Sequence, residues 1–212
     1  RDNKCHQILF EQGGSQVGNL KLLGKTSQTG TKVRFKADPE IFGNATYSYS
    51  TITERVQESA FLLENIKFTL RDWRTQEKKE EVFFYQDGIA SFIDYVTIDQ
   101  QPVGNPIILR GTNNKIETRV ALQYTGDYQE NIFSYVNLVR TKDGGTHEIG
   151  LRTAITRSFN EFARKYNVLK EKDKNFDGVD IREGLTAIIA LSIPESLLQF
   201  EGQTKSKLGS PA

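Results

Sequence analysis

A continuous apolar stretch near the end of the chain constrains the fold most strongly. Residues 185–193, with the sequence LTAIIALSI, contain no charged side chain, and Pro194 follows directly. A run of this length without polar–apolar alternation is typical of a strand that is buried on both faces. We therefore expect a strand in the core that ends at Pro194, because proline has no backbone N–H for the ladder.

Three other segments have the periodicity of helices. Residues 51–64 and 89–96 carry apolar side chains at spacings of three and four. A longer helix is expected after the DGGT turn at residues 143–146, with Thr146 as its N-cap. The apolar face of this helix consists of Leu151, Ile155, Phe159, Phe162 and Tyr166.

Shorter segments between turn signals have the pattern of strands. Some alternate apolar and polar side chains, as Val33 and Phe35 do, and Gly, Pro or Asn residues separate them. The predicted strands are residues 6–10, 31–36, 66–71, 82–85, 105–110, 116–124 and 132–139. Together with the helices, this order predicts an α+β fold with predominantly antiparallel sheets.

The composition restricts the setting of the chain. The 28 basic and 27 acidic residues nearly cancel, so the net charge gives no argument for a nucleic-acid or membrane partner. Cys5 is the single cysteine, which excludes an internal disulfide and favours a reducing, cytoplasmic location. No apolar run approaches the roughly 18 residues that span a bilayer, and no signal peptide is visible. The chain begins at Arg1 and contains no methionine, so we expect a fragment.

Metal sites have little support in the sequence. Residues 173–178 start like a calcium-binding loop, but Gly184 stands at the twelfth position, where a bidentate glutamate is required. A solvated charged loop is the simpler interpretation. The chain has two histidines, and Cys5 and His6 are adjacent, so we expect neither a zinc site nor a Cys–His nucleophile pair. We expect no metal ligand in this chain.

The turn at residues 143–146 and the basic helix that follows it each allow two interpretations. The amides of the turn at residues 143–146 are suited to an anion, because they precede a helix, but a plain turn has the same sequence. The basic side chains on the following helix are suited to DNA phosphates, but they are also typical of a solvated helix face. These side chains are Arg152, Arg157, Arg164 and Lys165.

The polar loop QFEGQTKSKLGS near the C-terminus is the main candidate for a functional site. If the segment is extended, Gln203 and Lys205 point to the same side, because side chains two apart share a face. An ammonium group beside an amide donor is suited to a terminal phosphate. An ordinary basic loop is the competing interpretation. The rest of the chain contains no complete active site, so another part of the protein would have to hold the phosphate.

Several segments, in order along the chain, resemble one protein family. They include TGTKVRF around Thr31, GGTHE at residues 144–148, REGLTA at residues 182–187 and EGQTK at residues 201–205. These segments are specific in combination, and the resemblance covers nearly the whole chain. The chain resembles the B-type subunits of bacterial type IIA DNA topoisomerases, the family to which subunits of topoisomerase IV and of gyrase belong.

The resemblance implies an architecture of two domains. Residues 1–87 are expected to form the C-terminal part of a GHKL (Bergerat) ATP-binding domain. Residues 88–212 are expected to form a transducer domain with a ribosomal-S5-like fold, without its final helix. The family's general-base glutamate, magnesium-binding asparagine and glycine-rich lid would lie before Arg1.

The resemblance also places four site residues. The transducer-loop lysine that contacts the γ-phosphate of ATP corresponds to Lys205, the expected catalytic residue, and Gln203 is expected to assist it in binding ATP. The pocket threonine that helps to hold the adenine corresponds to Thr31. Arg1 corresponds to an arginine at the edge of the pocket in which aminocoumarin inhibitors bind.

Function and partners follow from the same resemblance. The complete subunit would hydrolyse ATP with Mg²⁺, and the transducer would couple ATP binding and hydrolysis to DNA strand passage. The expected partners are DNA, the A-type subunit and a second copy in an ATP-dependent dimer, in the cytoplasm and without a membrane. The alternative is a non-catalytic S5-like module that binds nucleic acid through the arginine-bearing helix.

Overall fold

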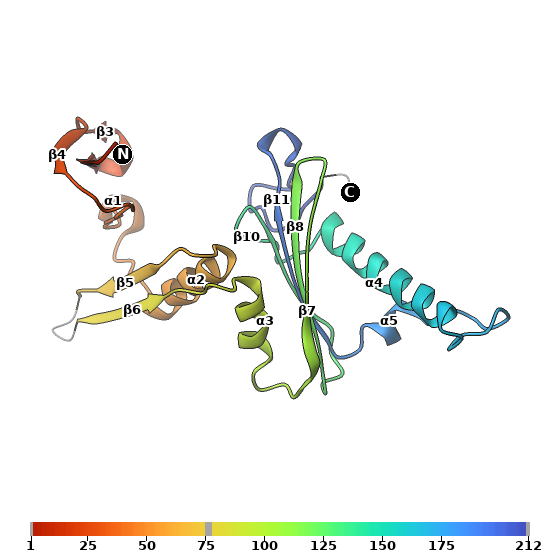
Figure 1. Cartoon of the computed structure of the whole chain (residues 1–212). Helices are drawn as coiled ribbons and strands as arrows, with labels where there is room; N and C mark the ends of the chain where they lie inside the picture. Colours follow the sequence, from red (N-terminus) through yellow and green to blue (C-terminus); the bar gives the residue numbers. More distant parts are fainter. Residues whose placement is uncertain (1, 75–77, 211–212) are drawn as a thin grey trace. The chain divides into compact units, whose positions relative to one another are not determined.

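The chain forms two compact units, residues 1–49 and residues 50–212 (Figure 1). The structure is a computed structural model, and it describes residues 2–74 and 78–210. Within these ranges, no helix combines the length and the apolar character needed to cross a membrane.

The first unit contains two small antiparallel sheets and one short helix. Its elements are β1 (Lys4–Gln7), β2 (Phe10–Glu11), the 3-10 turn η1 (Gln12–Gly14), β3 (Gln16–Val17), β4 (Lys21–Lys25) and α1 (Pro39–Phe42). β1 pairs with β4, and β2 pairs with β3. α1 begins where the Asp38 carboxylate accepts a hydrogen bond from Glu40 N at 2.9 Å. The single strand predicted at residues 6–10 is therefore wrong, because this segment is divided between two sheets.

The first unit lacks a hydrophobic core over residues 2–49, because none of these residues is buried. Val33 and Phe35 are 78% and 69% exposed. The strand predicted at residues 31–36 is absent, although its side chains alternate as a strand requires. Within the described chain no strand lies beside this segment, so its backbone N–H and C=O groups have no ladder partners.

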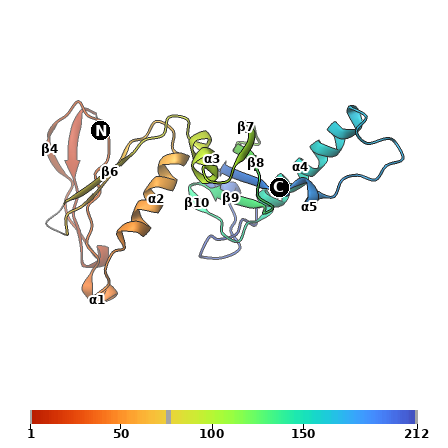
Figure 2. The same cartoon turned by 90° about the horizontal axis from the view of Figure 1, so that it is seen from below.

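The second unit is built on a five-stranded sheet with the order β10-β9-β11-β8-β7. Its elements are α2 (Tyr49–Leu62), β5 (Phe68–Asp72), β6 (Lys79–Phe83), α3 (Ile89–Thr97), β7 (Pro102–Asn113), β8 (Ile116–Thr125), β9 (Asn131–Val136), β10 (Val139–Arg140), α4 (Thr146–Lys165), α5 (Gly178–Ile181), β11 (Leu185–Ser192) and the 3-10 turn η2 (Glu195–Leu197). Neighbouring strands are antiparallel except β9 and β11, which are parallel. α3 and α4 lie on opposite sides of this sheet (Figures 1 and 2). The predicted α+β class with mainly antiparallel pairing is confirmed.

β11 is the central strand and is buried on both faces. Ala187 belongs to the apolar cluster on the α4 side, together with Ile155 and Ile181. Its neighbour Ile188 belongs to the cluster on the α3 side, because successive side chains of a strand point to opposite faces. The buried strand predicted from residues 185–193 is therefore confirmed.

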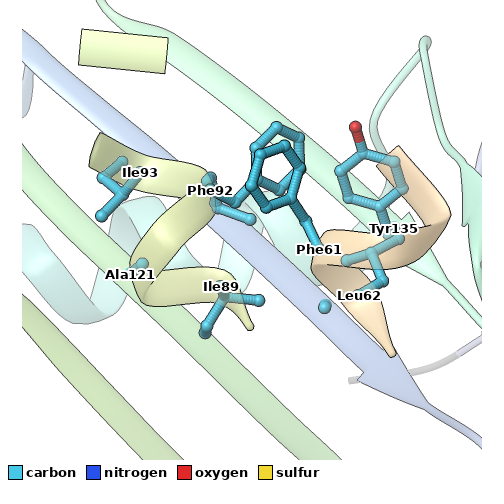
Figure 3. Close-up of a cluster of buried hydrophobic side chains, with 9 residues drawn as sticks. Phe61, Leu62, Ile89, Phe92, Ile93, Ala121 and Tyr135 are labelled. Atoms are coloured by element: carbon cyan, nitrogen blue, oxygen red, sulfur yellow. The ribbon is translucent and has the colours of Figure 1, made fainter. Parts of the chain in front are cut away.

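The end of α2 packs into the same core as α3 and the sheet (Figure 3). Phe61 and Leu62 are each 1% exposed. The ring of Phe61 stacks on Tyr85, with centroids 3.8 Å apart, and on Phe92, with centroids 4.7 Å apart. α2 is therefore joined to the sheet by two buried side chains of this cluster.

Two sequence predictions in the second unit need correction. The segment 132–139 is a hairpin, because Asn137 and Leu138 have φ values of 47° and 67° and turn the chain between β9 and β10. The predicted apolar face of the long helix is buried only in its first half. Leu151 and Ile155 pack on the sheet, whereas three further members of that face are exposed. They are Phe159 at 45%, Phe162 at 60% and Tyr166 at 59% exposure.

Candidate functional site

The loop at residues 202–206, called here the Lys205 loop, is closed at its base by a small hairpin. Phe200 and Leu208 form an antiparallel bridge, and Glu201 N donates a hydrogen bond to Lys207 O at 3.0 Å. The side chain of Leu208 is 2% exposed and belongs to a buried apolar cluster. The base of the hairpin is therefore anchored in the core, whereas most of the loop is exposed.

Lys205 presents an exposed ammonium group. Its φ of 54° lies in the left-handed region, which is uncommon for a residue other than glycine. In the described ranges, no carboxylate lies within ion-pair distance of its Nζ, which stands 5.9 Å from the centroid of the Phe200 ring. The neighbouring Lys207, in contrast, pairs with Glu201 at 2.9 Å. The charge of Lys205 is therefore available to an anion.

Gln203 and Lys205 lie in a turn rather than in the extended segment that the sequence suggested. Lys205 N donates a hydrogen bond to Gly202 O at 3.1 Å, which closes the turn. The extended backbone, on which the expectation of a shared side rested, is therefore wrong. Both side chains are nevertheless exposed on one short loop.

The root of the Lys205 loop is hydrogen-bonded to the turn that precedes α4. Asp143 N donates to Ser206 O at 2.9 Å. Leu208 makes two bonds with the same turn: its N donates to Gly144 O at 3.0 Å, and its O accepts from Thr146 N at 3.2 Å. Because the amides of Asp143 and Thr146 are used in this way, the structure favours a plain turn over an anion site here.

Gly145 and Thr146 allow this close approach. Gly145 has a φ of 137°, and a Cβ at this position would lie 2.4 Å from Leu208 O, so only glycine fits. Thr146 was expected to be the N-cap of the helix, but Gly145 occupies that position, without a side-chain cap. The Thr146 hydroxyl instead donates to Ser210 O at 2.7 Å. The sequence predicted the turn but not its hydrogen bonds to residues 206–210.

A buried polar network lies beside the same turn. Ser134 Oγ donates to Glu148 Oε1 at 2.6 Å and lies 2.6 Å from Thr141 Oγ1. Thr141 Oγ1 is in turn 3.0 Å from His147 Nε2, and Arg152 donates to Glu148 Oε2 at 3.1 Å. Burial lowers the pKa of His147, and the negative charge of Glu148 acts in the opposite direction. The network joins α4 to β9 and to the chain before the turn.

The sequence predicted two further site residues, Thr31 and Arg1. Thr31 is exposed in an irregular segment of the first unit. Arg1 lies outside the described residues.

The side chains of residues 173–178, which resemble the start of a calcium-binding loop, make hydrogen bonds within the chain. Asp177 accepts a hydrogen bond from Val179 N at 3.3 Å and caps α5, and Asp173 accepts from Lys170 N at 2.6 Å. Asn175 Oδ1 accepts from Arg164. Over residues 2–74 and 78–210, no group of three or more His, Cys, Asp or Glu residues could hold a metal ion.

The arginines of α4 have partners within the chain. Arg152 pairs with Glu130 at 2.9 Å, and Arg157 pairs with Glu161 at 2.6 Å. Arg164 also donates to backbone carbonyls of the loop after α4. Arg152 and Arg157 therefore have carboxylate partners, whereas Arg164 is held by neutral oxygens of the following loop.

Sequence comparisons point to one family. A family model described as DNA gyrase B matches residues 88–212. The B-type subunit of DNA topoisomerase 4 from Staphylococcus epidermidis is 53% identical over 211 residues, which are 99% of this chain and 32% of that protein. The corresponding protein from Bacillus subtilis is 51% identical over 210 residues, again 99% of this chain and 32% of that protein. The chain thus spans about a third of the length of the curated relatives it matches.

Solved structures agree with these sequence matches. The 43K ATPase domain of Thermus thermophilus gyrase B, in complex with an aminocoumarin, has a TM-score of 0.81 and 37% identity, and the match covers 100% of this chain and 56% of that chain. The B-subunit of the DNA gyrase from Myxococcus xanthus has a TM-score of 0.75 and 22% identity, covering 99% and 60% of the two chains, and shares the fold. The expected α+β fold of a GHKL ATPase region is therefore confirmed.

Proposed function

The chain belongs to the DNA gyrase B family, and from this premise we propose that it is a fragment of the ATP-hydrolysing subunit of a type II DNA topoisomerase, either topoisomerase IV or gyrase. In the complete subunit, this part of the chain would couple ATP binding and hydrolysis to DNA strand passage. The observation that carries the proposal is the exposed ammonium group of Lys205, which stands on an anchored loop without an ion-pair partner in the described ranges.

Lys205 would act by electrostatic stabilisation. Negative charge on the transferred phosphoryl group must be balanced in the transition state, and a positioned cation does this without proton transfer. Gln203, exposed on the same loop, would add an amide donor to the phosphate.

The other site residues belong to the same proposal. Thr31 would help to hold the adenine, and Arg1 would stand at the edge of the pocket. An aminocoumarin is bound to the Thermus thermophilus gyrase B domain, and we propose that such inhibitors bind the complete pocket here. No described cluster of carboxylates fits Mg²⁺, so we assign no residue of this chain to that ion.

We propose that residues 1–87 are the C-terminal part of the GHKL domain and that residues 88–212 are the transducer. The family match over residues 88–212 supports this division. The compact units divide earlier, after Tyr49, because the end of α2 packs on α3 and the sheet. α2 would therefore be the junction through which the two domains are joined.

The contact of Lys205 with a terminal phosphate would exist only while nucleotide is bound. Such a contact stabilises one arrangement of the transducer relative to the ATP-binding domain, and hydrolysis removes it. The proposed partners of the complete subunit are DNA, the A-type subunit and a second copy in an ATP-dependent dimer. The proposed location is the cytoplasm.

Lys205→Ala in the complete subunit tests the function of the loop. We expect ATP turnover to fall by at least about 10²-fold, the cost of removing one group that stabilises transition-state charge. The melting temperature should not change, because the side chain is exposed. The matched control is Lys207→Ala on the same hairpin, which loses only an exposed ion pair with Glu201 and should keep normal turnover. Near-normal turnover of Lys205→Ala would contradict the proposal.

The alternative of a nucleic-acid-binding module gains no support from the structure. It relies on the arginine-bearing face of α4, and Arg152 and Arg157 on this helix are ion-paired within the chain. Binding to phosphates would first have to break these pairs.

A further inference from the structure

The backbone of the Lys205 loop and the start of α4 form one hydrogen-bonded unit. Ser206 and Leu208, which closely follow Lys205, bond to the turn at residues 143–146 through three backbone hydrogen bonds. A parallel bridge between Gly145 and Leu208 belongs to the same contact. The backbone that follows Lys205 is therefore held by the turn before α4 as well as by its pairing with Phe200.

One side chain of α4 extends this contact beyond the backbone. Thr146 Oγ1 donates a hydrogen bond of 2.7 Å to Ser210 O, at the end of the segment that leaves the loop. Ser210 is 5% exposed, and its own hydroxyl donates to Leu197 O at 2.9 Å, on the segment that enters the loop. The Thr146 hydroxyl thus fixes the point at which the two arms of the hairpin are tied together.

The turn itself is hydrogen-bonded to the sheet through buried residues. Thr141 N donates to Ser134 O at 2.9 Å, and the Ser134 hydroxyl reaches Glu148 on the first turn of α4. Ser134 and Thr141 are each 2% exposed. The hydrogen bond from Thr146 therefore connects the loop segment to a turn that is itself bonded to the sheet.

We propose that Thr146 is a positioning residue for Lys205: its hydroxyl holds the root of the Lys205 loop so that the ammonium group meets the terminal phosphate. The proposal rests on the function proposed for Lys205. Thr146 itself does not touch the nucleotide. Its loss should lower the rate of the chemical step more than the affinity for ATP, because a displaced lysine weakens mainly the transition-state contact.

The test compares four variants of the complete subunit. Thr146→Val keeps the shape of the side chain and removes the hydroxyl, and Thr146→Ala is a second variant in case valine disturbs folding. Thr146→Ser restores the hydrogen bond. Thr153→Val is the matched control, because this exposed threonine of α4 donates only to Ile149 O at 2.8 Å. The two measurements are steady-state ATP hydrolysis and amide hydrogen exchange of residues 199–210.

Thr146→Val is expected to lower kcat about fivefold or more while KM for ATP stays within about twofold, in line with the loss of one hydrogen bond. Amide exchange of residues 199–210 should become faster. Thr146→Ser should restore both measurements, and Thr153→Val should change neither. An unchanged kcat in both Thr146→Val and Thr146→Ala would overturn the proposal, whether or not amide exchange becomes faster.

The result is separable from the test of Lys205 itself. If Lys205→Ala abolishes turnover and Thr146→Val does not lower kcat, the positioning role is wrong and the function of Lys205 stands. If Lys205→Ala keeps turnover, the function of the loop is wrong and the proposal falls with it, even where faster exchange shows that Thr146 orders the loop.

Discussion

His147 is 7% exposed, yet it is a titratable side chain next to the charged Glu148. Its Nε2 lies 3.0 Å from Thr141 Oγ1, and Nδ1 has no hydrogen-bond partner among the residues that the structure describes. Burial lowers its pKa from the ordinary value of 6.5, since a charged ring is poorly solvated here. The folded chain therefore favours the uncharged imidazole.

This shift predicts a pH dependence of stability. Above the unfolded pKa of 6.5 the imidazole is neutral in both states, and the full stability is present. As the pH falls from there to the lowered folded pKa, only the unfolded state takes up the proton, so stability is lost at up to about 1.4 kcal/mol per pH unit. Urea unfolding of the complete subunit, measured from about pH 7.5 down to about pH 5, should show this loss, and His147→Gln should remove it. The exposed His6, changed to Gln, is the control and should leave the loss in place.

The resemblance to a family proposed a role for the charged Lys205, but it did not reveal the structural role of Thr146. Lys205 stands in a distinctive segment, so its role could be proposed from the amino-acid sequence alone. The role of Thr146 depends on Ser210, 64 residues later, and no local pattern connects a threonine with a distant carbonyl oxygen. The sequence therefore assigned Thr146 to the commonest local role, the N-cap.

At the scale of elements, periodicity succeeded where an element packs on neighbours within the chain. The helix predicted at residues 51–64 is α2, and the helix predicted at residues 89–96 is α3. The segment 31–36 has the alternation of a strand but no neighbour, and a strand without ladder partners gains no backbone hydrogen bonds. Residues 132–139 are apolar almost throughout, and their apolar pattern hid the turn at Asn137, where a positive φ reverses the chain.

The attachment of α2 to the sheet leads to a prediction at the same scale. Phe61→Ala in the complete subunit removes a ring that is 1% exposed and stacked on two others, and we expect a loss of about 3–5 kcal/mol in the free energy that protects the amides of α3 and β11. Hydrogen exchange measures this loss. Phe162→Ala removes a ring that is 60% exposed and should cost no more than about 0.5 kcal/mol. Equal effects of the two changes would show that α2 is not part of this core.

At the scale of the whole chain, the two units differ in how completely they are packed. The second unit has apolar clusters on both faces of its sheet, whereas no residue in positions 2–49 is buried. An adenine pocket that depends on Thr31 would therefore have no buried core around it within residues 2–49. The Lys205 loop supplies a positive charge but no group that can activate water.

These two deficits predict that the 212-residue chain does not hydrolyse ATP on its own. We expect phosphate release from the purified chain to equal that of a Lys205→Ala version, because a cation without a base and a formed pocket cannot support turnover. The complete subunit, assayed in parallel, should hydrolyse ATP and lose this activity with the same substitution. Hydrolysis by the 212-residue chain that disappears in its Lys205→Ala version would show that these residues contain their own base, and the assignment of residues 1–87 to a partial ATP-binding domain would then be wrong.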